Sequence, residues 1–173
     1  MFKFFKKKHD YSDKLYNKIL LFSRNKFFYK EIGLADSYHV RLMLIFFHFS
    51  FLIVNLSDKK SSQDIKEISQ FIFDKMFQKI DQDMREQTMG DVTVNKNMKI
   101  LINNFYNILH ESKGYLKLND HKKNELFKKY MIDNPNIQKP NLSQLINYFN
   151  KYQSFCFDLS INSVLKGEIN FKH

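Results

Sequence analysis

The chain has 173 residues, 43% of them hydrophobic, and a formal net charge of +10 at pH 7. A chain of this length folds as one domain that buries about 70% of its unfolded surface, and the hydrophobic content excludes an intrinsically disordered protein. A single cysteine, Cys156, excludes an internal disulfide and a cysteine-based metal cluster, and it indicates an intracellular protein. Because Cys156 stands between Phe155 and Phe157, we expect it to pack as a small apolar residue.

The positive charge has two interpretations. An anionic partner, such as nucleic acid, a ribosome or a membrane surface, would account for it. However, only Arg24, Arg41 and Arg85 are arginine among the 28 basic residues, and alanine occurs once, at Ala35. That composition, rich in Lys, Asn, Ile and Phe, is typical of drift toward A/T-rich codons. The charge is therefore functional or compositional, and both interpretations stay open.

Scarce Gly and Pro, together with apolar patterns of helical period, predict an all-α fold: one compact domain of about six helices. The expected N-caps of the first three helices are Ser12, Asp36 and Ser62. Gly90 is expected to stop the third helix in a left-handed conformation, as Gly167 is expected to end the last. In chain order the helices are expected over about residues 12–30, 37–56, 63–88, 91–113, 119–132 and 141–166.

A basic aromatic tail, residues 1–10 (MFKFFKKKHD), precedes the predicted helical domain of residues 11–173. No apolar region of 7–15 residues follows it, so the sequence predicts no secretory signal. Each lysine near an anionic leaflet contributes about 1 kcal/mol to binding, so the tail lysines are candidate membrane contacts. A solvated tail shaped by codon composition is the alternative. The candidate lysines are Lys3, Lys6, Lys7 and Lys8.

The longest nearly apolar run extends from Leu42 to Leu56. As a helix it would be about 22 Å long, which is shorter than the hydrocarbon core of about 30 Å. We therefore expect a buried central helix, and a membrane-inserted segment is the alternative.

Motifs of catalysis and of metal binding are missing from the sequence. It contains no phosphate-binding loop, no dinucleotide fingerprint and no HExxH, and its histidines are scattered. His48 stands within the apolar run, where a histidine is usually a hydrogen-bonded core residue and less often a ligand or catalyst. The sequence predicts a protein that is not an enzyme and that holds neither a cofactor nor a metal.

The stretch from Phe71 to Tyr106 carries the most information, because two amphipathic segments flank a charged break. Asp81 and Arg85 are spaced i, i+4 and can form an ion pair. Asp91 stands near the start of the next helix, where unpaired N–H groups favour a carboxylate. These residues form either a helix corner clamped by caps and ion pairs or a polar recognition rim beside an apolar groove. Methionines add adaptable apolar surface at Met43, Met76, Met84, Met89, Met98 and Met131.

The same stretch contains a pattern formed by Phe73, Asp74, Met76, Phe77, Asp81, Arg85, Glu86, Gly90, Asp91, Val94, Lys96, Met98, Lys99, Phe105 and Tyr106. It resembles the motif of the ubiquinol–cytochrome c chaperone family, LFDxMFxxxD followed by REMGVGDLxVxKxMK and an AFYGR-like run. Residues 23–36 (SRNKFFYKEIGLAD) resemble the family's ARxPxFYxxxGVPD, and LKGEINF at residues 165–171 resembles its ending. Arg41 and His48 fall where the family has an Arg and a His. The chain departs from the pattern at Asn25, Thr88 and Asn107.

The resemblance implies a helical, non-enzymatic assembly chaperone. Such a chaperone binds newly made cytochrome b and promotes assembly of the cytochrome bc1 complex, respiratory complex III (ubiquinol–cytochrome c reductase). It implies a cytoplasmic protein, peripheral on the inner membrane or on the matrix side of a mitochondrion, with a ribosome or a small helper protein as further partners and no DNA. The expected partner-binding residues are Tyr29, His48, Asp81, Arg85, Glu86, Gly90, Asp91, Lys96, Lys99 and Tyr106.

Two alternatives belong to other classes of protein. A basic helical RNA-binding or ribosome-associated module would bind bare RNA with strong salt dependence. An enzyme that handles lipid or quinone would need a deep pocket lined by polar groups, for which the sequence contains no pattern.

Overall fold

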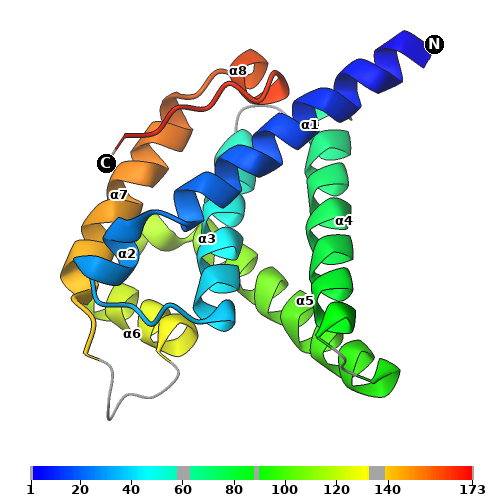
Figure 1. Ribbon diagram of the computed structural model, residues 1–173. Helices are drawn as coiled ribbons and strands as arrows, with labels where there is room; N and C mark the ends of the chain where they lie inside the picture. Colours follow the sequence, from blue (N-terminus) through cyan, green and yellow to red (C-terminus); the bar gives the residue numbers. More distant parts are fainter. Residues whose placement is uncertain (1, 58–62, 88–89, 133–138, 173) are drawn as a thin grey trace.

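A computed structural model of the chain describes residues 2–57, 63–87, 90–132 and 139–172. Within these ranges the chain forms α-helices and one short 3-10 helix, and no strand, so the all-α prediction is confirmed (Figure 1). The elements are α1 (Phe2–Ser23), α2 (Lys26–Lys30), α3 (Tyr38–Ser57), α4 (Gln63–Glu86), α5 (Asp91–Lys113), η1 (Tyr115–Lys117), α6 (Asp120–Met131), α7 (Leu142–Asp158) and α8 (Ile161–Leu165).

Helix α3 forms the centre of the core, with α1, α4, α5, α6 and α7 packed around it (Figure 1). Its sequence is apolar on nearly every side, as expected for a helix that other helices surround. In the described part of the chain, α3 alone is long and apolar enough to span a membrane, but 83% of its window Tyr38–Leu56 is buried. The prediction of a buried central helix over Leu42–Leu56 is therefore confirmed.

Aromatic rings fill much of the space around α3. Phe47 packs against Phe127 and Phe149, with ring centroids 5.1 Å and 5.6 Å away. On the other side of α3, Phe46 meets Phe105 of α5 edge-on at 5.5 Å. Such pairs contribute about 0.5–1.5 kcal/mol each beyond the area that they bury, so the phenylalanine-rich composition serves the core.

The predicted start and end of the first helix are both wrong. Helix α1 begins at Phe2, so the backbone of residues 2–10 is helical and Ser12 does not cap it. The helix ends at Ser23, because the Asn25 side chain accepts a hydrogen bond from the N–H of Phe27 at 3.0 Å and caps a separate helix, α2. A short polar side chain thus competes successfully with continuation of the helix.

Ser37, and not Asp36, caps the central helix. The Ser37 hydroxyl accepts a hydrogen bond from the N–H of Val40 at 3.2 Å. The Asp36 carboxylate instead pairs with Arg41, whose Nε lies 2.7 Å from its Oδ1. The prediction of Asp36 as the cap is therefore wrong, because its side chain binds a guanidinium one turn into the helix. The predicted cap of the third helix, Ser62, lies outside the described residues.

The glycines confirm the predictions only in part. Gly90 has φ −65° and ψ 150°, which is extended backbone, and it is the N-cap of α5, so the predicted left-handed stop is wrong. Gly167 has φ 68° and ends the last helix as predicted. The predicted helix over 141–166 is broken, because the Ser160 hydroxyl accepts a hydrogen bond from Ser163 N–H at 3.0 Å and starts α8.

Candidate functional site

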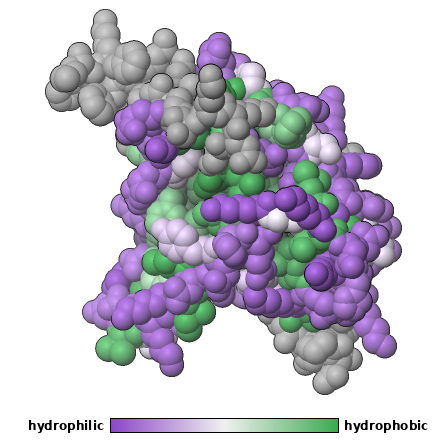
Figure 2. Space-filling view, turned by 180° about the vertical axis from the view of Figure 1, so that it is seen from behind, coloured by the Kyte–Doolittle hydropathy of each residue, from purple (hydrophilic) through white to green (hydrophobic). Residues whose placement is uncertain are grey.

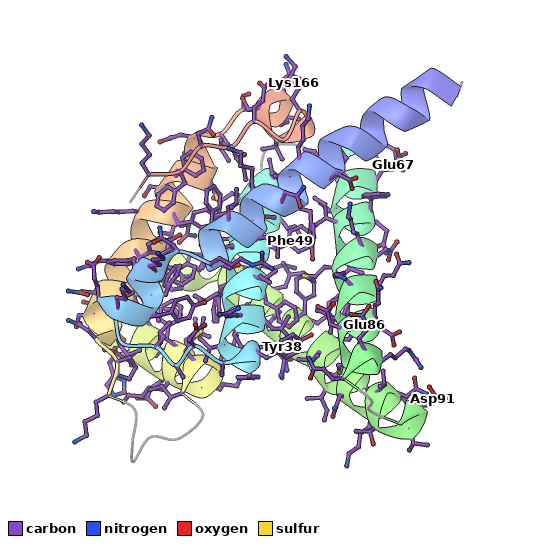
Figure 3. All side chains as sticks on the ribbon, viewed as in Figure 1. Tyr38, Phe49, Glu67, Glu86, Asp91 and Lys166 are labelled. Atoms are coloured by element: carbon purple, nitrogen blue, oxygen red, sulfur yellow. The ribbon has the colours of Figure 1, made fainter. Side chains whose placement is uncertain are left out.

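An open groove of about 590 Å³ lies between α1, α3 and α4. Its floor consists of apolar side chains that are buried or nearly so: Leu20, Leu42, Ile45, Met76 and Ile80. Tyr38 at the start of α3 and Glu86 at the end of α4 stand on either side of it (Figure 3). Helix α1 crosses the first half of α4, and the two helices diverge toward the end of α4, which leaves the groove between them (Figure 1). Lys75, in the middle of α4, pairs with Asp13 of α1.

Charged side chains form the rim of the groove, and most are already paired. Lys79 Nζ lies 3.2 Å from Asp83 Oδ1 within α4. The Arg41 guanidinium donates to Asp36, and this hydrogen bond holds the pKa of the Asp36 carboxyl below its usual range. Rim and floor together can hold an apolar segment and contact its polar flanks.

Three tyrosines add hydroxyl groups near the groove. Burial raises the pKa of Tyr38 to about 12, so its phenol stays protonated and can donate a hydrogen bond. Burial also raises the pKa of Tyr16, which lines the same groove. Tyr29 lies beside it, where its hydroxyl donates to the Ser23 carbonyl at 3.0 Å and the Arg41 guanidinium lies 6.0 Å from its ring. Tyr29, which the sequence predicted as a partner contact, therefore stabilises the junction between α1 and α2.

Arg85 clamps the corner between α4 and α5. Its Nε lies 2.7 Å from Asp81 Oδ2, and its Nη2 lies 3.2 Å from Asp81 Oδ1. Its Nη1 also donates to the Asp91 carboxylate at the start of α5. The predicted Asp81–Arg85 pair is confirmed, and the clamp lowers the pKa of the Asp81 carboxyl through the hydrogen bond from Arg85. The corner is clamped, whereas Glu86, the next residue, lines the groove.

A different surface carries Lys96, Lys99 and Tyr106. All three are exposed on one side of α5, and Tyr106 is 53% exposed although its ring centroid lies 5.8 Å from that of Phe73. Val92 and Ile100 are exposed apolar neighbours on the same helix. On the reverse side of the molecule, hydrophobic patches lie between hydrophilic side chains (Figure 2). The predicted site residues are thus divided between the groove, the corner and the outer face of α5.

His48 is fully buried in the core. Its Nδ1 lies 2.6 Å from the Leu44 carbonyl oxygen and its Nε2 lies 2.7 Å from the Tyr148 hydroxyl. Burial lowers the pKa of His48 to about 4, which keeps the imidazole neutral. The structure supports the hydrogen-bonded core interpretation, because the side chain has no surface for a partner to contact.

Sequence reasoning missed three residues that line the groove: Tyr16, Arg24 and Tyr38. Periodicity does not reveal them, because Tyr16 falls among the core residues, Arg24 follows the last residue of α1, and Tyr38 is the first residue of α3. One signal was available, since all three arginines of a lysine-rich chain lie in or beside this groove. The side chains of Lys3, Lys6, Lys7 and Lys8 lie outside the described part. Among the described residues, no group of three or more His, Cys, Asp or Glu comes together as a metal site.

Known proteins resemble the chain in fold and in sequence. The crystal structure of the Cbp3 homolog from Brucella abortus superposes with a TM-score of 0.84 over 99% of this chain and 93% of that one. At 20% identity, that likeness establishes the fold alone. No curated protein sequence matches the chain significantly. Residues 30–171, which include α3 to α8 and the groove walls that they supply, match the ubiquinol–cytochrome C chaperone family. The chain therefore belongs to the ubiquinol–cytochrome C chaperone family.

Proposed function

We propose that this chain is a non-enzymatic chaperone that binds newly made cytochrome b and promotes its assembly into the cytochrome bc1 complex. Family membership supports the assembly role. The groove between α1, α3 and α4 is the observation that carries the binding role. A buried apolar floor with a charged rim suits a segment of a membrane protein before that segment has inserted.

The geometry of the groove supports a chaperone's need to bind and release. Its floor includes Met76 and Leu20, flexible side chains that adapt to different apolar shapes. The groove is open along one side, so a bound segment can leave without unfolding of the chaperone.

Photo-crosslinking tests this proposal directly. A photoreactive amino acid replaces Tyr38, on the groove wall, in cells that synthesise cytochrome b. The matched control places the same amino acid at Lys151, an exposed position on α7. We expect a crosslink to cytochrome b from position 38 and not from position 151. A properly accumulated protein with no cytochrome b adduct at position 38, or equal adducts at both positions, would contradict the proposal.

We extend the proposal to a peripheral location on the cytoplasmic or matrix side of the membrane. The amino-terminal half of α1 reaches beyond α4 (Figure 1), and its sequence alternates phenylalanine with lysine. Aromatic residues and lysines favour the interface of an anionic bilayer. Docking there would hold the groove near emerging membrane segments.

A ribosome and a small helper protein are further proposed partners. The exposed lysines of α5 and α6, including Lys96, Lys99 and Lys122, are candidate contacts for an anionic partner. Salt titration separates this role from an RNA-binding module that acts on its own, since only the latter would bind bare RNA with a steep salt dependence.

A further inference from the structure

We propose that the groove selects an apolar helical segment that carries a carboxylate beside its apolar strip, and that Arg24 binds this carboxylate. The inference rests on the proposed function and names the chemistry of the bound segment. Its basis is the distribution of charge around the groove.

Two of the three arginines of the chain line the groove, and the third stands at the corner next to it. Arg24 and Arg41 line the groove, and Arg85 precedes Glu86, which also lines it. Every other basic residue in the chain is lysine. A guanidinium differs from an ammonium because its planar fork can bind a carboxylate through two parallel hydrogen bonds. Arginine at this site therefore indicates recognition of a planar anion. Lysine would serve equally well if only positive charge were needed.

Arg24 is the arginine that is available to a partner. Arg41 is held by Asp36, and Arg85 is held by Asp81 and Asp91. Arg24 is exposed, and within the described part of the chain its guanidinium makes no ion pair or side-chain hydrogen bond. Burial raises the pKa of Tyr16 and of Tyr29, and the nearby charge of Arg24 partly offsets this by lowering the pKa of both.

A negatively charged side chain lines the α4 wall of the groove. Glu86 ends α4 and lines the groove, and its carboxylate accepts a hydrogen bond only from the neutral side chain of Gln82, at 2.8 Å, among the described contacts. A carboxylate in the groove is attracted to Arg24 and repelled by Glu86, so the pair of charges sets the orientation of the segment as well as its sign. The Tyr38 phenol supplies a further neutral donor on the rim.

Peptide binding tests the selection by charge. The probes are three synthetic 16-residue helical peptides with one identical leucine strip, flanked on one side by glutamates, glutamines or lysines. Exposed ion pairs contribute about 0.2–1 kcal/mol each, so the wild-type protein should bind the glutamate peptide about 1.4- to fivefold more tightly than the glutamine peptide. Arg24→Glu should abolish this preference and reverse it toward the lysine peptide. Lys151→Glu makes the same change of charge on α7 and should leave the preference intact.

Three results would overturn the inference. One is equal affinity of the wild-type protein for all three peptides, and another is an unchanged preference in a folded Arg24→Glu variant, with folding checked by the thermal melt. The third is a dimer of the protein that forms through the groove and excludes the peptides. The crosslink from position 38 to cytochrome b is measured in the same variant. If that crosslink persists while peptide selection fails, the charge inference is wrong and the proposed function stands.

Discussion

His48 and Tyr148, one hundred residues apart in sequence, form a buried hydrogen bond in which His48 Nε2 lies 2.7 Å from the Tyr148 hydroxyl. The other ring nitrogen, Nδ1, faces the Leu44 carbonyl and must carry the proton, because a carbonyl can only accept. Nε2 therefore accepts the Tyr148 hydroxyl proton. The Tyr152 hydroxyl donates to the His48 carbonyl at 3.2 Å and ties α7 to α3 a second time.

His48 makes the stability of the fold depend on pH. Burial lowers its pKa from 6.5 to about 4, so between these values the unfolded state binds a proton that the folded state does not. The free energy of unfolding is therefore highest above about pH 6.5 and falls as the pH is lowered toward 4. The full decrease is about 3 kcal/mol. Urea unfolding at pH 7.5, 6 and 5 measures it. Compared with wild type, His48→Gln should have a flatter pH profile over this range, and parallel profiles would show that His48 titrates normally.

Arg85→Ala should impair cytochrome b accumulation more than it impairs folding. The ion pairs of the Asp81–Arg85–Asp91 clamp are exposed and contribute little to stability, so the variant should melt only a few degrees below wild type. The clamp also fixes the end of α4, where Glu86 enters the groove. Thermal melts and the cytochrome b level are measured together.

Arg85→Lys is the matched control for that variant. It keeps the charge and loses the two-pronged contact with Asp81, so we expect an intermediate cytochrome b level. A normal level of cytochrome b in cells that accumulate the Arg85→Ala protein would show that the clamp has no role in binding.

Gly90→Ser should stabilise the protein by about 0.5–1 kcal/mol, because a serine hydroxyl can accept a hydrogen bond from the first turn of α5 and the side chain also restricts the unfolded chain. Gly90 is the N-cap of α5 in extended backbone, no side chain caps the helix there, and a Cβ added to Gly90 would meet no atom within 4 Å. Gly33→Ala is the contrasting variant, because Gly33 has φ 81° and should lose about 1 kcal/mol. Chemical denaturation of both variants decides, and a destabilised Gly90→Ser would restore the left-handed interpretation of this glycine.

Deletion of residues 1–9 should weaken binding to anionic vesicles and leave the fold intact. Among the side chains of α1 that the structure describes, Leu15, Tyr16 and Ile19 are buried in the core, and they lie beyond the deletion. Each of the four removed lysines contributes about 1 kcal/mol near an anionic leaflet, and this attraction is screened by salt. Co-sedimentation with anionic and with neutral vesicles, at low and high salt, measures the effect. Equal sedimentation of both proteins at low salt would leave the segment without a docking role.

The sequence by itself determined the helical class, the apolar faces and the position of the central helix, because these follow from local periodicity. The same periodicity predicted the Asp81–Arg85 pair, since both residues lie on one helix. It could not place the breaks at Asn25 and Ser160, where a side chain of one residue captures a backbone N–H and ends a pattern that would otherwise continue. It also could not decide whether His48 was accessible, because Tyr148 and Tyr152 arrive from a helix far along the chain. Only the tertiary structure decided where the groove lies, because it forms where α1, α3 and α4 diverge, and the crossing of distant helices depends on packing that no local pattern contains.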